Sequence, residues 1–578
     1  MKVNKLSILG LGTMLALSAA SCSDDITGEN TKVDFNDVET NYLTINIVAG
    51  PTTTRAGENV YDDGSEGTYQ DGNATENYVK SVRFYFFNAT GNAANVVNSS
   101  GIKQSYLDWD PKEDEQALTP NDHNVEKVLG AKLIINTQNG DALPASVVAV
   151  INPTSSIKGE NISSIDKLNQ VTGNYAITSE NEKEGFLMSN SIYVNETGKE
   201  MEEVSVSNHI FNTSQQAENN PVTIYVERVN AKVTLDVNES MKPVPGKVGI
   251  YDTTIKNETG ATEQPIYVQF LGWNVTAVTN NTNLMKDINP GWTNQNVFGN
   301  ASIAWNSPTR FRSFWAMNPS EVDYVYGPFN TKDTPTAANA ITDFTNGYAY
   351  TLENASPFSN TISLSKTVNP TQVIVAAQLL DENFKPLTIA EYGNQQFTLD
   401  GLKKEIAGLS NVYKVTPNGD TSYRYTKIDE NDITFVTAMT LDPSLDTWTK
   451  TGRYYVFAQL KDTDKVDYSI GENTEINNVE ANKSLVALGH AKIWSEGYTY
   501  WYFDISHLGV ENSVGQYGVV RNHIYAATIN SVKGLGTPVY NPDETIYPEK
   551  PSDDDSYIAA KINILNWRLI RQGVDFAW

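Results

Sequence analysis

The residues that most often perform catalysis are scarce in this chain. It has five His, at positions 123, 209, 490, 507 and 523, and none is spaced as in an HExxH zinc motif. No GxSxG nucleophile elbow occurs, and Cys22 is the only Cys. The run DTDKVD at 462–467 begins like a calcium loop, but Val466 takes the fifth position and no Gly follows it. We therefore expect no enzymatic activity, no metal site and no cofactor.

The net charge and the number of carboxylates exclude further classes of function. Lys and Arg total 42 against 69 Asp and Glu, a formal net charge of -27, so the chain should repel nucleic acid and anionic lipid surfaces. Carboxylates are too numerous to nominate a glycosidase pair, because that assignment needs a separation in space. His507 and His523 lie in aromatic, strand-like surroundings and are expected to be structural.

The N-terminus has the layout of a secretory signal. Lys2 and Lys5 precede an apolar run over 6–20, which is too short for a confident membrane span. The small residues before Cys22 resemble a bacterial lipobox, in which the Cys is acylated and becomes the mature N-terminus. Ser23-Asp24-Asp25 looks like the acidic tag that exports lipoproteins of the Bacteroidetes to the cell surface. The alternative is an ordinary signal peptide that is cut elsewhere. An exported body that begins at Cys22 has no other thiol for disulfides.

A short strand precedes an isolated Arg. Residues 26–41 are polar and acidic and predict a linker, after which Leu43, Ile45 and Ile47 alternate with polar residues as in a half-buried strand. Gly50-Pro51 ends the strand, and a polar stretch leads to Arg55-Ala56. A trypsin-like protease needs such a segment, because it must pull several residues into an extended conformation. We interpret Arg55-Ala56 as a processing site; an ordinary surface Arg is the alternative.

The rest of the chain has the sequence pattern of an all-β protein. Strand-like runs separated by Gly, Pro, Asn and Asp recur at 78–91, 146–153, 222–237, 371–381, 453–460 and 498–505. Helices are expected only as short accessories. One is predicted where Ile162, Ile165, Leu168 and Val171 recur at intervals of three, and another where Leu402, Ile406 and Leu409 share one helical face.

One strand-like run changes phase. Val222, Ile224 and Val226 hold one alternation, and from Val229 onward the apolar residues hold the other. A phase change flips the inward face, so the chain either bulges or passes to a new sheet near 227–228. We place a domain boundary there.

The C-terminal tail is unusually apolar for a chain end, and such an end must dock somewhere. Its apolar residues are Ile558, Ala560, Ile562, Ile564, Leu565, Trp567, Leu569, Val574 and Phe576. They alternate on one face up to Ile564 and on the other from Leu565. The tail is either a closing strand of its own domain or a strand donated to another molecule. Each buried side chain would contribute about 1.5–3 kcal/mol, so a donated tail could replace the strand with Leu43, Ile45 and Ile47.

Four segments resemble one family. They are GFLMSNS at 185–191, VERVNAKV at 226–233, YGVVRNHIYAATINSVKGLGTPV at 517–539 and KINILNWRLIRQGVDF at 561–576. Together they resemble the fimbrillins of Bacteroidales type V pili. The tail is most similar to the shaft (major) subunit of the minor fimbriae, the Mfa1-like family.

The resemblance implies two transthyretin-like β-sandwich domains and a lipidated precursor on the cell surface. An Arg-specific protease would remove the N-terminal strand, and the C-terminal segment of a neighbour would fill the groove. Carried onto this sequence, 1–21 is the signal peptide, 22–55 the lipidated propeptide with the removable strand, 56–225 and 226–555 the two domains, and 556–578 the donor segment.

The implied partners are copies of the same chain, anchor and tip subunits of the fimbria, the maturation protease, and a host or bacterial surface ligand. The outer membrane is a partner through the lipid on Cys22 before processing. A tip or anchor subunit, or a glycan-binding surface lipoprotein, is the alternative. The apolar tail argues against a tip, and the Arg in a polar segment argues against a permanent anchor. A surface glycan-degrading enzyme is disfavoured because strand aromatics usually belong to a core and no catalytic site was found.

Overall fold

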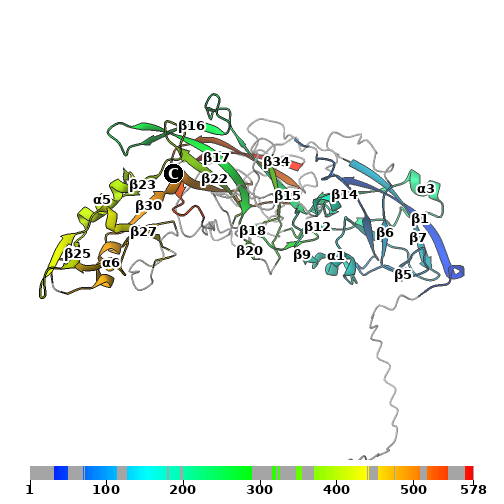
Figure 1. Cartoon of the computed structure of the whole chain (residues 1–578). Coiled ribbons are helices and arrows are strands. Elements are labelled where there is room, and N and C mark those ends of the chain that lie inside the picture. The colour runs from blue at the N-terminus through cyan, green and yellow to red at the C-terminus, as the bar shows by residue number, and fades with distance from the viewer. Residues whose placement is uncertain are drawn as a thin grey trace, which may run out of the picture.

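The structure is a computed structural model of the whole chain (Figure 1). It describes residues 32–49, 69–70, 72–112, 127–178, 181–194, 200–288, 316–319, 323–325, 347–354, 370–438, 440–441, 454–473, 475–507, 517–543 and 567–576. These residues form mainly β-strands in several sheets with a few short helices, so the all-β prediction is confirmed.

The largest sheet is built from N-terminal strands. In spatial order it contains β5 (Lys103–Gln104), β4 (Val96–Val97), β7 (Lys127–Gln138), β1 (Val38–Ala49), β14 (Val222–Arg228), β10 (Met188–Asn190), β8 (Ser146–Ile151), β3 (Val82–Phe87) and β6 (Tyr106–Trp109), with β13 (Val204–Ser205) beside β8. Every residue of β3 and β8 is buried, which matches their continuous apolar sequences. Side chains on one face of these two strands belong to the main core of the large sheet. Side chains on the other face form a second core with the short helices.

The helices of this half are single turns or little more. They are α1 (Ser155–Gly159), α2 (Ile165–Asn169), α3 (Ser214–Asn219), η1 (Phe35–Asp37) and η3 (Glu182–Glu184). The spacing predicted a helix through Ile162 and Val171, but α2 covers only the middle of that range. Ser164 ends it on one side because its side chain accepts a hydrogen bond from the backbone N–H of Lys167.

The second half contains a β-sandwich. One of its sheets has the order β2 (Tyr69–Gln70), β34 (Trp567–Phe576), β32 (His523–Val532), β15 (Asn230–Val237) and β21 (Tyr348–Leu352). The other has the order β16 (Ile250–Asn257), β17 (Gln264–Thr276), β22 (Gln372–Leu380), β31 (Tyr498–Asp504) and β33 (Thr537–Pro538). A single hydrophobic core lies between them, with Val233, Phe270, Val375 and Trp501 among its members.

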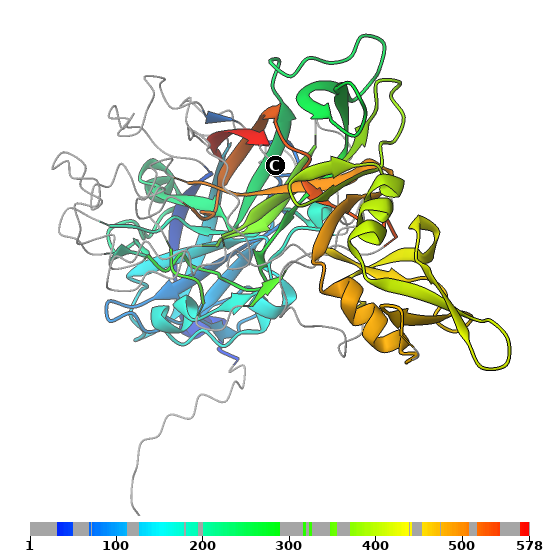
Figure 2. The same ribbon diagram turned by 90° about the vertical axis from the view of Figure 1, so that its left-hand side faces the viewer.

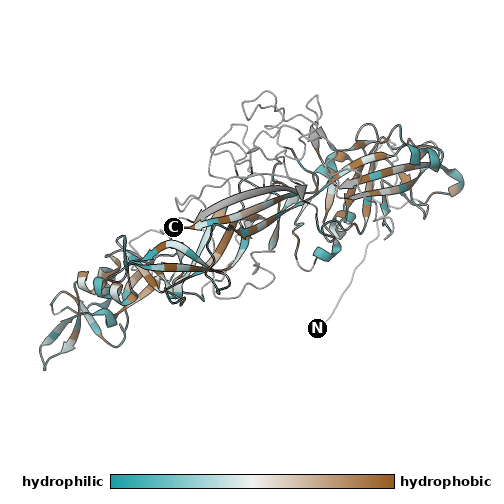
Figure 3. Ribbon diagram, turned by 90° about the horizontal axis from the view of Figure 1, so that it is seen from above, coloured by the Kyte–Doolittle hydropathy of each residue, from teal (hydrophilic) through white to brown (hydrophobic). Residues whose placement is uncertain are grey.

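A third unit is inserted between β22 and β31 and has its own hydrophobic core. Its strands are β23 (Ile389–Tyr392), β24 (Gln395–Phe397), β25 (Val412–Pro417), β26 (Tyr423–Lys427), β27 (Ile433–Thr437), β28 (Val456–Leu460), β29 (Asp467–Ile470) and β30 (His490–Trp494). Its helices are α5 (Leu399–Leu409), α6 (Asn478–Val486), η5 (Glu430–Asp432) and η6 (Ser495–Gly497). The unit projects from one end of the elongated molecule, and the large N-terminal sheet forms the other end (Figures 1 and 3). Figure 2 views the molecule from the side of the inserted unit, whose strands and helices are yellow and orange.

Three short ladders complete the described strands. They pair β9 (Thr172–Gly173) with β19 (Thr282–Asn283), β11 (Tyr193–Val194) with β12 (Glu200–Met201), and β18 (Val278–Thr279) with β20 (Tyr324–Val325). The first of them brings a segment of the second half back onto the first half.

The chain passes from the large sheet to the sandwich within one residue. Val229 separates β14 from β15, at the place where the apolar alternation changes phase. The phase change therefore marks a passage to a new sheet. The division into domains at 225 and 226 stays a prediction.

Candidate functional site

β1 is an interior strand of the large sheet. It pairs antiparallel with β7 over its whole length, from Val38 opposite Gln138 to Ala49 opposite Lys127. Its second half also pairs parallel with β14, with Ile45 opposite Val222. Both backbone edges of β1 are thus hydrogen-bonded there. A sheet without β1 would therefore have an open slot, bordered by one unpaired edge of β7 and one unpaired edge of β14.

The inward side chains of β1 lie in the core. Leu43, Ile45 and Ile47 are only 1%, 0% and 2% exposed, as their alternation predicts. Their partners across β7 are Leu133, Ala131 and Leu129. Removing such side chains from water contributes about 1.5–3 kcal/mol each, so these three supply much of the attachment of β1. Their predicted role as a discarded strand is untested.

The segment before β1 is also attached to the sheet, although the sequence predicted a linker over 26–41. The backbone N–H of Val33 donates to the carbonyl of Gly101 at 2.8 Å. Asn139 donates from its backbone N–H to the carbonyl of Asp37 and from Nδ2 to Oδ1, both at 3.0 Å, and Gln138 Nε2 donates to Oδ2 at 3.4 Å. We call this group of contacts the Asp37 corner. It holds a carboxylate at the outer end of the β1 slot.

The predicted lipid site and processing site lie outside the described residues. Cys22, Arg55 and Ala56 are all in this part of the chain. The chain is described again at Tyr69–Gln70, which form β2, and then over residues 72–112.

Glu76 fastens the segment that follows the predicted processing site. Its carboxylate accepts from Lys232 Nζ at 2.8 Å and from the Tyr350 hydroxyl at 2.5 Å, while Arg228 Nε donates to its carbonyl at 2.9 Å. Burial raises the pKa of Glu76, but the hydrogen bonds from Lys232 and Tyr350 outweigh it, so the pKa lies below its ordinary value. Because Arg228 ends β14 and Lys232 lies in β15, this segment is held where the large sheet meets the sandwich.

The end of the tail closes the sheet of its own chain. β34 pairs parallel with β32, and β2 pairs with the other edge of β34. Phe576 is fully buried, stacked on Trp501 with ring centroids 4.8 Å apart, and edge-on to Phe270 at 6.4 Å. This is the closing-strand arrangement that the sequence left open as an alternative.

The remaining predicted donor residues fall into two groups. Ile558, Ala560, Ile562, Ile564 and Leu565 lie outside the described residues. Trp567, Leu569 and Val574 are described only as backbone positions of β34. The described part of the tail, residues 567–576, pairs with β32 and β2 and not with the neighbours of β1.

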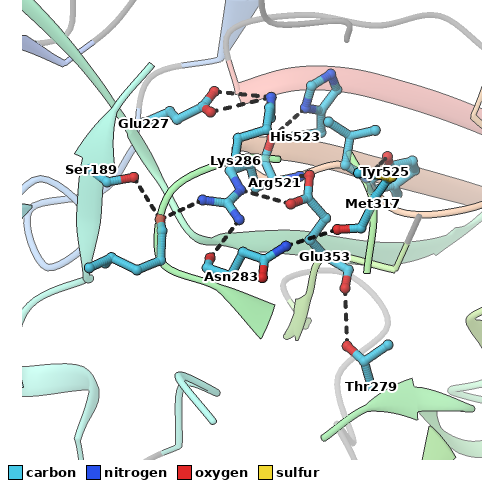
Figure 4. A network of polar contacts seen from close by, with 12 residues as sticks. Ser189, Glu227, Thr279, Asn283, Lys286, Met317, Glu353, Arg521, His523 and Tyr525 are labelled. Carbon is cyan, nitrogen blue, oxygen red and sulfur yellow. Dashed lines mark hydrogen bonds and ion pairs between the residues drawn. The ribbon is translucent and has the colours of Figure 1, made fainter. Parts of the chain in front are cut away.

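A buried polar network joins the two halves (Figure 4). Arg521 Nε donates to Glu353 Oε2 at 2.8 Å, and its two terminal nitrogens donate to the carbonyls of Leu284 and Asn283 at 2.9 and 2.7 Å. Ser189 Oγ of the large sheet donates to the same Leu284 carbonyl at 2.9 Å. Buried ions need such partners, because an unpaired charge there is costly.

A second buried ion pair lies beside the first. Lys286 Nζ is 3.3 Å from Glu227 Oε1, and both side chains are at most 1% exposed. Sequence reasoning gave these residues no role. The signal that could have found them is the charge inside apolar runs, at Glu227-Arg228 in VERVNAKV and at Arg521 in VVRNHIYA.

The two histidines near this network are buried, as expected for structural residues. His523 Nδ1 lies 2.7 Å from the carbonyl of Arg521, and His507 Nδ1 lies 2.9 Å from the Tyr525 hydroxyl. Among the described residues, no three or more His, Cys, Asp or Glu gather in a way that could hold a metal ion. In the same part of the chain, no helix has the length and apolar character needed to cross a membrane.

Known proteins give one family-model match and several distant structural likenesses. Among solved structures, a fimbrilin (fimA) from Porphyromonas gingivalis covers 92% of this chain and 97% of its own, at 11% identity and a TM-score of 0.32. The tip fimbrial protein Mfa3 from the same organism, with a C-terminal truncation, covers 67% of this chain and 100% of its own, at 12% identity and a TM-score of 0.26. A fimbrial assembly protein from Parabacteroides distasonis covers 75% of this chain and 100% of its own, at 9% identity and a TM-score of 0.28.

No curated protein matches the chain. The family match includes Arg521 and most of β34, and it ends before Phe576. Residues 492–573, which include β31, β32, β33 and most of β34, match the family model described as major fimbrial subunit protein type IV, Fimbrillin, C-terminal.

Proposed function

We propose that this chain is a structural subunit of a surface fimbria, made as a lipoprotein precursor and polymerised after cleavage at Arg55. In this proposal the protease separates β1 from the rest of the chain, and the C-terminal segment of a neighbouring copy takes its place. The subunit forms the shaft and supports adhesion to a host or bacterial surface ligand. Anchor and tip subunits are its other partners, and the lipid on Cys22 holds the precursor at the outer membrane.

The observation that carries the proposal is the position of β1. It is an interior strand with three fully buried side chains, yet the predicted processing site follows it in sequence. A cut at Arg55 leaves β1 without a covalent link to the remaining chain. Packing and hydrogen bonds alone would then retain it, and a competing strand of similar chemistry could replace it.

Two further observations support the proposal. Residues 492–573 match the fimbrillin C-terminal model, which supports a fimbrial subunit. Glu76 fastens the chain after the processing site, so cleavage would release β1 without loosening the start of the mature chain.

The experiment is to examine the protein sheared from cells by N-terminal sequencing, intact mass and electron microscopy. We expect filaments whose subunits begin at Ala56. Arg55→Ala should yield uncut, lipidated monomers, whereas the control Arg424→Ala, which changes an exposed Arg of β26, should assemble normally. Filaments made from uncut Arg55→Ala chains would overturn the proposal.

A terminal subunit of the fimbria is the second candidate. β34 lies in the sheet of its own chain, and a chain that keeps its tail there cannot donate that strand. Antibody labelling separates the two candidates, because a shaft subunit is labelled along the whole filament and a tip or anchor subunit only at one end. A lipidated monomer that begins at Cys22 and binds glycans would instead indicate a surface lipoprotein.

A further inference from the structure

The ion pair of Lys286 and Glu227 lies in apolar surroundings where the two halves of the chain meet. Glu227 comes near the end of β14, and Lys286 follows β19. Both side chains are at most 1% exposed, and Val229, Leu284 and Met285, close to them in sequence, belong to one buried hydrophobic cluster. Water therefore stabilises neither charge, and the pair depends on its own contacts.

The contacts of Lys286 are poor for a buried ammonium. Nζ lies 3.3 Å from Glu227 Oε1 and 3.4 Å from Oε2, whereas hydrogen bonds between charged groups are usually about 2.7–2.9 Å long. Among the described residues, these two oxygens are the only partners of Nζ, although an ammonium carries three N–H donors. The pair therefore recovers little of the free energy that the burial of its two charges costs.

The geometry of the pair suits a reaction better than a salt bridge. Nζ is almost equally distant from both oxygens, so it faces the carboxyl carbon Cδ between them rather than one oxygen (Figure 4). Reacting atoms that are held about 3–3.5 Å apart in a fixed orientation react far faster than free groups do in solution. A Lys amine in apolar surroundings is a nucleophile once it has lost its proton.

We propose that Lys286 and Glu227 form an isopeptide bond between Nζ and Cδ, a covalent link from the large sheet to the second half of the chain. Nζ gives up two of its three protons and attacks Cδ, and one carboxylate oxygen leaves with these two protons as water. The third proton stays on the amide nitrogen. The pair is neutral overall before and after the step, so no oxidant, reductant or other co-reactant is needed. The product replaces two buried charges with a neutral amide, which removes their desolvation cost.

The pair of Lys232 and Glu76 provides a contrast within the same chain. Lys232 Nζ lies 2.8 Å from one oxygen of Glu76, Oε1, which also accepts from the Tyr350 hydroxyl at 2.5 Å. These hydrogen bonds keep the pKa of Glu76 below its ordinary value, and an ionised carboxylate resists attack by an amine. We therefore expect this pair to stay noncovalent.

The cross-link has a structural consequence. Residues 227 and 286 are 59 positions apart, and the loop that the bond closes contains β15, β16 and β17. Glu227 of the large sheet would stay joined to the second half even where the noncovalent contacts are lost. A disulfide cannot supply such a link, because Cys22 is the only Cys. The inference does not depend on the proposed function.

The test is peptide mapping of the folded full-length chain. The protein is purified, denatured, digested with trypsin and examined by mass spectrometry. We expect the peptide that ends at Arg228 to be joined to the peptide that contains Lys286, with the mass of both less one water, and no cleavage after Lys286. The peptides with Lys232 and Glu76 should be separate. The control variant is Lys286→Arg, which keeps the positive charge but offers no amine, and its Glu227 peptide should be unjoined.

A second measurement shows whether folding makes the bond. Full-length chain that is synthesised and kept in urea should have the mass of its sequence, and it should lose one water after refolding. Separate peptides from the folded wild type would mean an ordinary ion pair and would overturn the proposal. Joined peptides in Lys286→Arg, or a link at other residues, would refute the assignment to this pair. If Lys286→Arg does not fold, the wild-type map still decides. Filament formation is scored separately, so neither result is mistaken for a failure of the proposed function.

Discussion

The ring of Phe576 lies flat against the indole of Trp501, with centroids 4.8 Å apart and planes inclined by 5°. This stack attaches the end of β34 to the opposite sheet of the sandwich.

Phe576→Ala should destabilise the full-length chain by about 3 kcal/mol, because it leaves a cavity in a core that is otherwise close-packed. The measurements are urea unfolding and the near-ultraviolet circular dichroism of the tryptophans, which should lose the contribution of the stack. Phe35→Ala is the control, since Phe35 is exposed in η1. An unchanged spectrum and midpoint for Phe576→Ala would contradict the packing described here.

Ile45→Ala should lower the free energy of unfolding of the full-length chain by about 2–5 kcal/mol. Its side chain is fully buried in the core of the large sheet, and its backbone lies between β7 and β14. Ile134→Ala provides a matched control in the adjacent strand, because the Ile134 side chain is 54% exposed and its truncation should change stability by less than about 0.5 kcal/mol. Thermal and urea unfolding of the purified full-length chain give both values. Equal losses for the two variants would show that β1 is not held by its inward face.

Glu76 should make the stability depend on pH in the acidic range. Its pKa is lowered in the folded chain, so its contribution is complete above the ordinary value of 4.5 and is lost as the pH falls through the folded value. Glu76→Gln should cost about 1–3 kcal/mol at pH 7, because Lys232 and Tyr350 lose a charged acceptor, and should flatten the fall in stability below pH 4.5.

The control for Glu76 is Glu184→Gln. Glu184 pairs with Lys80, but its side chain is 63% exposed, so the loss should be small. Urea unfolding between pH 3 and pH 7 measures all three proteins. A Glu76→Gln profile parallel to that of the wild type would assign the acid dependence to other carboxylates.

Breaking the buried pair of Arg521 and Glu353 should be strongly destabilising. Arg521→Leu leaves the Glu353 carboxylate without its guanidinium partner, with an expected cost of about 3–5 kcal/mol. The double variant with Glu353→Leu should recover part of this loss, and the cycle gives the coupling between the two residues. Arg424→Leu, at an exposed position, is the control. Additive effects of the two single changes would mean that the pair contributes no coupling.

The sequence predicts the strands well where alternation is clean and poorly where tertiary contacts decide. The inward positions of β1 follow from alternation, but its start at Val38 does not, because the polar residues before Leu43 are placed by the backbone of β7. In α5, Leu402 and Ile406 are buried as the helical spacing predicts, whereas Leu409 is exposed at the end of the helix. The spacing of apolar residues along a helix does not show where the helix loses contact with the elements packed beside it.

Two features are beyond the reach of one sequence. The inserted unit between β22 and β31 consists of short strands like those of the sandwich. No local pattern in the sequence therefore shows that the unit has a hydrophobic core of its own. Arg521 and Glu353 are far apart in the chain. The charge of Arg521 alone does not show which of the many carboxylates is its partner.

The inserted unit has one further consequence. β22 and β31 are neighbours, with Gln378 opposite Tyr498, so the chain leaves the sandwich and returns to it at adjacent points. A segment whose two ends meet can be lengthened, shortened or exchanged without shifting either flanking strand. The inserted unit can therefore change in length and in surface under selection while the strands of the sandwich keep their pairing.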